Sequence, residues 1–141
     1  MIWKNKVDIE AINKLSKNMV SLLDIKFSEV TDDSISATMP VDSRTKQPFG
    51  ILHGGASVVL AETIGSIASF LVIGEGSEVP VGLEINANHL RSVANGLVTA
   101  KCTPIHIGRK THVWDIKISN DDGKLVCISR LTIAIVEKPK N

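Results

Sequence analysis

Aromatic residues and net charge of either sign are both scarce in this chain. It has two tryptophans, three phenylalanines and no tyrosine, and its formal net charge at pH 7 is only +1. Proteins that read nucleic acids usually combine a basic excess with aromatic side chains that stack on bases. We therefore expect no nucleic-acid partner, although a local group of lysines and arginines could still bind a small phosphorylated ligand.

Cysteine is also rare, and neither of the two present belongs to a CxxC pair. Cys102 and Cys127 both fall in strand-like runs, which is typical of reduced, buried thiols in a cytosolic protein. The four histidines show no HExxH or related spacing, so we predict neither a metal nor another cofactor. The first ten residues, MIWKNKVDIE, lack the apolar stretch of a signal peptide, so we expect a cytoplasmic location.

One hydrophobic run is long enough to test as a membrane span. It extends from Ala56 to Ile73 and contains a single formal charge, Glu62. A carboxylate near the middle of a membrane helix costs about 3 kcal/mol, and glycine, serine and threonine weaken the run further. We therefore expect a soluble protein with no membrane partner.

The hydrophobic pattern predicts a single α+β domain over residues 1–141. Residues 8–18 have helical spacing with Asp8 as N-cap, and residues 23–41 read as a hairpin of two strands. A polar loop then leads into the long helix, and about four strand-like segments fill residues 81–136. Because hairpin connections dominate, we expect a mostly antiparallel sheet of five to six strands with the long helix laid against it.

Glu62 is the unusual residue of the long helix. A helical wheel puts an apolar face opposite Glu62, made of Leu60, Ile64, Ile67 and Leu71. The face around Glu62 has small residues, Ser66 and Ser69 among them, and no other charge, whereas a solvated helix face usually has several. Such a face is typical of one covered by protein, where a carboxylate is costly unless it is paired or used. A general base would explain it, and an ordinary amphipathic surface helix is the alternative.

The residues before this helix offer groups that could bind an anion. His53, Gly54 and Gly55 lead into its first turn, where glycine lets a ligand approach and unpaired N–H groups carry the positive end of the helix dipole. A developing oxyanion fits such a place, and Gln47 in the preceding loop could donate a further hydrogen bond. An acid together with oxyanion donors suits acyl transfer, although a Gly-Gly turn alone is common.

Two longer motifs resemble a known enzyme family. QPFGILHGGASVVLAETIGS and VGLEINANHLRS are similar to the hotdog-fold acyl-CoA thioesterases of the 4-hydroxybenzoyl-CoA type, which have an acidic residue on the central helix. Within that type the motifs most resemble the 1,4-dihydroxy-2-naphthoyl-CoA hydrolases of menaquinone biosynthesis. A related group of proofreading thioesterases of enterobactin synthesis shares much of the pattern, and the resemblance extends over essentially the whole chain.

The resemblance implies hydrolysis of an acyl-CoA whose acyl group is aromatic. It also implies a sheet wrapped around the helix, an active site between two subunits whose sheets join edge to edge, and a tetramer of two such dimers. Glu62 would be the nucleophile or the base for water, and the Gly54 N–H would be the oxyanion donor. Gln47 would lie near the carbonyl or the leaving thiolate, Ser66 would hold the attacking water, and His53 matches the histidine of the Gly-Gly turn.

The same resemblance implies two substrate-binding segments. The segment expected to meet the substrate comprises Gly82, His89, Leu90, Arg91 and Ser92. The turn expected to meet the CoA nucleotide comprises His106, Ile107, Gly108, Arg109, Lys110 and Thr111. Arg109 and Lys110 are natural phosphate partners, but polar residues at strand ends and charges in a solvated turn also occur without any function.

Two other functions stay open on the residues alone. A hotdog dehydratase would rely on a histidine paired with an acid, and His53 has no obvious partner of that kind. A non-catalytic module would bind an acyl-CoA and leave the thioester intact. In a hydrolase the acyl pocket should be apolar, with Phe49, Ile51 and Val58 as nearby candidates.

Overall fold

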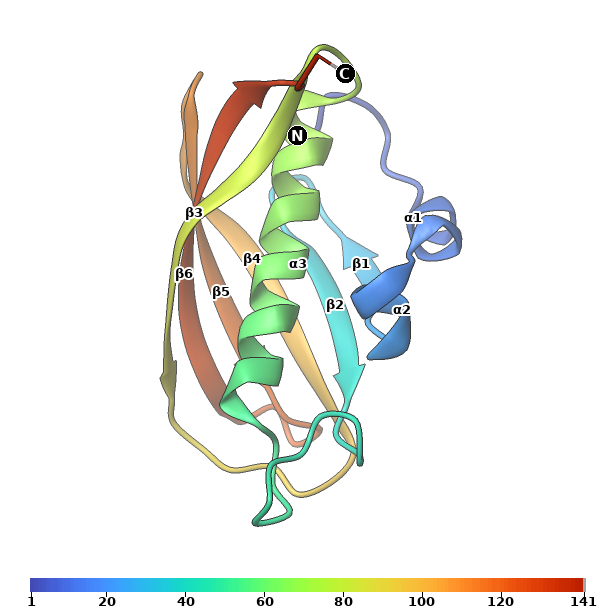
Figure 1. The fold of residues 1–141 in the computed structure, drawn as a ribbon, viewed down its shortest axis with the longest axis vertical. Helices are drawn as coiled ribbons and strands as arrows, with labels where there is room; N and C mark the ends of the chain where they lie inside the picture. The colour runs from blue at the N-terminus through green and yellow to red at the C-terminus, as the bar shows by residue number, and fades with distance from the viewer. Residues whose placement is uncertain (141) are drawn as a thin grey trace.

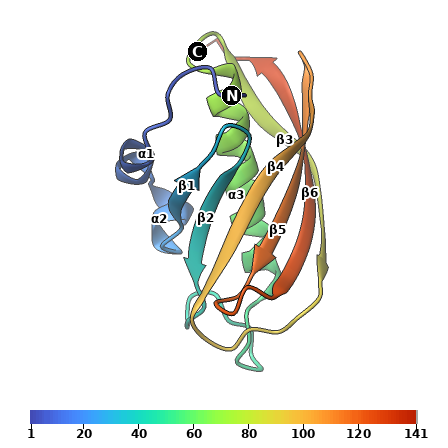
Figure 2. The ribbon, with the colours of Figure 1, turned by 180° about the vertical axis from the view of Figure 1, so that it is seen from behind.

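A curved sheet of six strands wraps around one side of a long helix (Figure 1). The computed structural model describes residues 1–140. The strands are β1 Lys26–Val30, β2 Ile35–Pro40, β3 Glu78–His89, β4 Leu97–Ile107, β5 Thr111–Ser119 and β6 Leu125–Glu137. Their order across the sheet is β1-β2-β4-β5-β6-β3, and every neighbouring pair is antiparallel (Figure 2). The predicted α+β class, with its long helix and antiparallel sheet, is confirmed.

The long helix α3, Gly54–Ile73, begins and ends at residues suited to those places. His53 is the N-cap, and its Nδ1 accepts a hydrogen bond from the Gly55 N–H at 2.8 Å. Gly74 ends the helix with a φ of 69°, a value that glycine adopts without strain. The helix is long and apolar enough to cross a membrane, but one side of it packs on the sheet and forms part of the core.

The face of α3 that meets the sheet differs from the wheel prediction. Ser69 is fully buried, whereas Ile67 and Leu71 are only partly buried. The reason is the close approach of helix and sheet, since a Cβ added to Gly65 would lie 2.5 Å from Leu131 Cδ2. Leu60 and Ile64 are fully buried, as the wheel predicts. Small residues fill the other positions against the sheet, and Ile67 and Leu71 lie toward the open side of α3.

Two short helices replace the single N-terminal helix predicted for residues 8–18. Helix α1 spans Ile9–Leu15 and α2 spans Asn18–Leu22. The predicted N-cap is confirmed, because the Asp8 carboxylate accepts from the Ala11 N–H at 3.0 Å. The first helix ends at Ser16, whose backbone is extended with a ψ of 127°, and the Ser16 hydroxyl donates to the Ile12 carbonyl at 3.0 Å.

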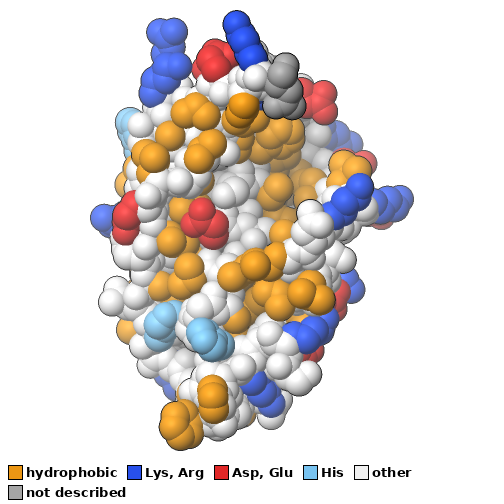
Figure 3. Space-filling model, viewed as in Figure 1, with side chains coloured by type: hydrophobic (Ala, Val, Ile, Leu, Met, Phe, Trp, Pro, Cys, Tyr) orange, Lys and Arg blue, Asp and Glu red, His pale blue; other side chains and the backbone are white. Residues whose placement is uncertain are grey.

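Strand β3 is an edge of the sheet over its whole length. It pairs with β6 on one side, with a register shift between Gly82 and Glu84. Val81 and Leu83 on this strand are exposed, and so is Phe70 on the neighbouring face of α3. Apolar side chains are spread widely over this side of the molecule (Figure 3). A long unpaired edge beside an apolar face is a ready template for pairing with another chain.

Candidate active site

Glu62 lies near the middle of α3, with its carboxylate against strand β3. The residue is partly buried. A Cβ added to Gly82 would lie 2.2 Å from Glu62 Oε1, so the carboxylate fills the space that any other side chain at position 82 would need. The helix and the irregular part of β3 thus bring together two residues that the sequence motifs place twenty positions apart.

An apolar hollow of about 670 Å³ opens beside this carboxylate. Glu62 and Ser66, one helical turn apart, both line it. Its remaining wall comes from α3 itself, from the two N-terminal helices and from β1, through residues that include Ile67, Phe70, Ile12, Leu15, Val20 and Phe27. The volume lies within the usual range for a small-molecule pocket.

The acyl-pocket candidates drawn from the sequence lie elsewhere in the single chain. Phe49 is 90% exposed at the tip of the loop before α3. Ile51 lines a different hollow, and Val58 contributes to neither. The loop turns away because Gln47 and Gly50 close a tight turn, with Gly50 at a φ of 82°. Sequence analysis missed the wall formed by α1 and α2, for which the apolar residues at helical spacing in this segment were the available signal.

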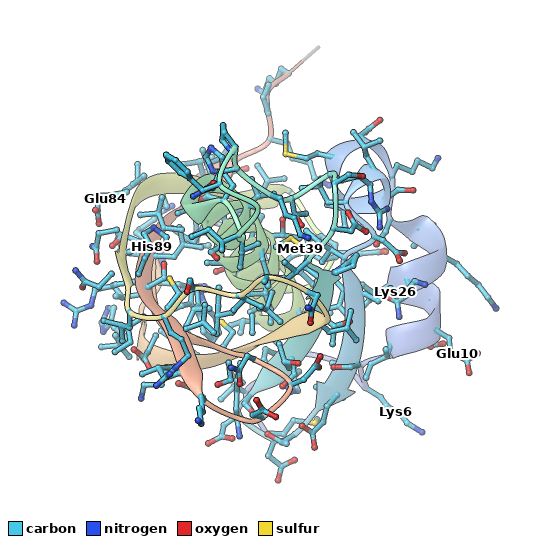
Figure 4. The ribbon with its side chains drawn as sticks, turned by 90° about the horizontal axis from the view of Figure 1, so that it is seen from below. Lys6, Glu10, Lys26, Met39, Glu84 and His89 are labelled. Atoms are coloured by element: carbon cyan, nitrogen blue, oxygen red, sulfur yellow. The ribbon has the colours of Figure 1, made fainter. Side chains whose placement is uncertain are left out.

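A second group of expected site residues surrounds the start of α3. A hollow of about 370 Å³ there is lined by Gln47 and Gly54, by the last residue of β3, His89, and by the three residues that follow it, Leu90, Arg91 and Ser92. The imidazole of His89 lies against Gly54, where an added Cβ would be 2.8 Å from Nε2. Figure 4 views the molecule from this end, with His89 labelled.

The Gly54 N–H is the donor left free at the helix start. The Gly55 N–H bonds to His53 Nδ1, and the N–H groups of Ala56 and Ser57 bond to the His53 carbonyl. No acceptor for the Gly54 N–H lies among residues 1–140. His53 therefore acts as a helix cap with its Nδ1 occupied, and one backbone donor stays available for a ligand.

Gln47 offers a second donor to the same hollow. Its side-chain carbonyl oxygen accepts a hydrogen bond from the Phe49 N–H. Its amide nitrogen has no partner among the residues that the structure describes. The side chain is thereby oriented so that it can donate to an oxygen bound in the hollow.

These two groups do not meet within one chain. Gly54 and Glu62 are eight residues apart, which is about 12 Å along a helix axis. An oxyanion donor and an attacking group must both come within about 3 Å of the same carbonyl group. A single subunit therefore holds the two halves of the expected site apart.

The turn expected to bind the CoA nucleotide lies at the opposite end of the sheet. It joins β4 to β5, and Lys110 in it is 3.6 Å from Glu78 at the beginning of β3. His89 ends the same strand eleven residues later, about 35 Å away along a fully extended strand. Both Arg109 and Lys110 are exposed, and within residues 1–140 Arg109 forms no ion pair.

The cysteines are placed as the sequence predicts. Cys102 and Cys127 are both free and buried, and burial raises the pKa of each thiol. Inert thiols are the expected result. Across residues 1–140 no three histidine, cysteine or acidic side chains are grouped so that they could hold a metal ion.

Known proteins share both this sequence and this fold. Residues 49–127, which are more than half of the chain, match the family described as the thioesterase superfamily. The chain belongs to the thioesterase superfamily. The predicted hotdog fold and the predicted enzyme class, thioester hydrolase, are therefore confirmed.

Individual relatives of this thioesterase are similar over nearly their whole length. It is 58% identical to the 1,4-dihydroxy-2-naphthoyl-CoA hydrolase of Escherichia coli K12, over 96% of this chain and 100% of the relative. It is 49% identical to the proofreading thioesterase EntH of Cronobacter sakazakii, over 96% and 99% of the two chains. A crystal structure of a variant of thioesterase PA1618 from Pseudomonas aeruginosa superposes with a TM-score of 0.96 at 54% identity, covering 98% and 100%.

Proposed function

We propose that this thioesterase hydrolyses acyl-CoA esters with an aromatic acyl group, and in particular 1,4-dihydroxy-2-naphthoyl-CoA in menaquinone biosynthesis in the cytoplasm. The observation that carries the proposal is a partly buried carboxylate, Glu62, in the wall of an apolar hollow of about 670 Å³. The hollow is large enough for a flat bicyclic ring. The name of the Escherichia coli relative supports this choice of acyl group.

In the proposed chemistry one group attacks the thioester carbonyl, and a separate site stabilises the oxyanion that forms. Either Glu62 takes a proton from a water held by Ser66 and that water attacks the carbonyl carbon, or the carboxylate attacks and water then cleaves the anhydride. In both routes the carbonyl oxygen becomes an oxyanion that accepts hydrogen bonds from the Gly54 N–H and the Gln47 amide. The C–S bond breaks, and the products are the carboxylic acid and CoA.

Two subunits complete this site in the arrangement that we propose. On strand β3, Gly82 lies against Glu62 and His89 lies against Gly54, so this one strand contacts both halves of the site. Two β3 edges paired antiparallel about a twofold axis between Ile85 and Asn86 would bring Gly82 opposite the partner's His89. The same pairing would place the turn at residues 108–111 near the helix start of the other subunit. The tetramer of two such dimers rests on the family resemblance alone.

A subunit-mixing experiment tests this arrangement. Glu62→Ala and Gln47→Ala subunits would each be nearly inactive alone, but a mixed dimer would contain one intact site. Random pairing at equal expression should then restore about a quarter of the wild-type rate, because half of the dimers are mixed and each has one of two sites intact. A mixture no more active than its two parents would show that each subunit carries a complete site.

A substrate panel tests the proposed activity. Release of thiol should be compared for 1,4-dihydroxy-2-naphthoyl-CoA, benzoyl-type CoA esters, aliphatic CoA esters and aryl groups on a carrier protein. We expect the highest kcat/KM for the naphthoyl ester. Preference for the carrier-protein thioester would favour a proofreading role, as the name of the Cronobacter relative suggests. Binding of every thioester without cleavage would overturn the proposal.

A further inference from the structure

Three buried polar side chains connect α3 to strand β5. Trp114 Nε1 donates to Ser69 Oγ at 2.8 Å, and Ser69 Oγ is 3.0 Å from His112 Nδ1. All three residues are at most 2% exposed. The proposed chemistry uses none of them, and Ser69 was placed by the helical wheel on the face of Glu62, away from this position.

These hydrogen bonds limit the roles of Ser69 and His112. An indole N–H can only donate, so Ser69 Oγ accepts from Trp114. The hydroxyl has a second lone pair and one hydrogen, so Ser69 meets His112 Nδ1 as acceptor or as donor, and a neutral imidazole satisfies either direction. Burial lowers the pKa of His112, which favours this neutral form; a hydrogen bond with the Gly108 backbone opposes that shift, and His106 adds to it.

His112 directly follows the turn at residues 108–111, and it pairs with Ile107 on the other side of that turn. The turn is also held by the Gly108 N–H, which donates to the Thr111 carbonyl at 2.9 Å, and by the Ile135 N–H, which donates to the Lys110 carbonyl at 2.9 Å. Among the contacts of this turn, His112 is the one that leads back to the central helix.

We propose that Ser69 and His112 are positioning residues that hold the turn at residues 108–111 in the shape that receives the phosphates of CoA. This inference rests on the proposed acyl-CoA hydrolysis and on the phosphate role of Arg109 and Lys110. A turn ordered before binding loses less conformational entropy when the ligand binds. A fully satisfied buried network also holds one geometry more rigidly than apolar packing of the same volume.

The test compares two thioesters of the same acyl group, one on CoA and one on N-acetylcysteamine, which lacks the nucleotide. In Ser69→Ala we expect KM for the CoA ester to rise about three- to tenfold, with kcat nearly unchanged. KM for the N-acetylcysteamine ester should stay at the wild-type value. His112→Gln, which keeps a hydrogen-bonding amide that can pair with Ser69, should show a smaller rise and serves as the second variant.

The matched control is Ser129→Ala on β6. Ser129 is also buried, with its hydroxyl bonded to the Asn86 carbonyl at 2.8 Å, but it makes no contact with the turn. Its variant should leave the KM ratio of the two esters unchanged. Equal changes for both esters in Ser69→Ala, or no change in either, would refute the positioning role.

Arg109→Ala distinguishes failure of this inference from failure of the proposed function. If Arg109→Ala raises KM for the CoA ester and Ser69→Ala does not, the inference alone is wrong. If the wild-type protein cleaves neither thioester, the proposed function and the inference fall together.

Discussion

Replacement of Glu62 by alanine is expected to lower kcat for aryl-CoA hydrolysis by at least about 100-fold, the usual contribution of a positioned acid or base. The fold should survive, because Glu62 is only partly buried and makes no ion pair within residues 1–140. The rate of CoA release can be followed with a thiol reagent. Circular dichroism and size-exclusion chromatography of the variant should match those of the wild-type protein.

Two further variants make the result specific to this carboxylate. Glu62→Gln keeps the shape of the side chain and removes its charge, so it should lose as much activity as Glu62→Ala. Glu10→Gln is the matched control, because Glu10 is an exposed carboxylate on α1 that does not line the hollow (Figure 4). Retention of more than about a tenth of the wild-type rate by Glu62→Ala would rule out both roles considered for it.

Gly82→Ala is expected to have the second largest effect, a fall in kcat of about 100-fold, the cost typical of a reacting group displaced by about 1 Å. The added methyl group would lie 2.2 Å from Glu62 Oε1, closer than any real contact allows, so the carboxylate must move. Gly76→Ala is the matched control, because nothing lies within 4 Å of the Cβ position there. Steady-state kinetics with the preferred aryl-CoA ester measure both variants.

The double variant Glu62→Ala, Gly82→Ala separates displacement of the carboxylate from a direct role of Gly82 in substrate binding. If Gly82 acts only by leaving room for Glu62, the double variant should be no slower than Glu62→Ala alone. A further loss of rate in the double variant would indicate contact between position 82 and the substrate. If Gly82→Ala keeps the wild-type kcat, the reaction does not depend on a fixed position of the Glu62 carboxylate.

Local signals in the sequence account for most of the secondary structure. The boundaries of α3 follow from His53, the glycines after it and Gly74, all of which act within one helical turn. The strands of the second half follow from alternating patterns and hairpin turns, which are also local. Glu62 is the only charged residue of α3, and this alone predicts a functional role before its surroundings in the fold are known.

The break between α1 and α2 shows where local pattern is insufficient. Ile9, Ile12 and Leu15 have helical spacing, and the same spacing continues weakly to residue 18. In the folded chain Asn13 of α1 bonds to both backbone groups of Phe27 on β1, and α2 follows as a separate helix. That gain depends on β1, which the helix reaches only in the folded chain.

The amino-acid sequence by itself determined the class of fold, the bounds of its long helix and the family of the enzyme, because these depend on short-range periodicity and on motifs that can be compared directly. The separation of Gly54 and Glu62 likewise follows from eight residues of helix and needs no tertiary information. Only the tertiary structure decided which face of α3 meets the sheet, that Gly82 makes room for Glu62, and that α1 and α2 wall the hollow beside it. The physical reason is that close packing depends on distances between elements remote in sequence, and such distances leave no periodic trace along the chain.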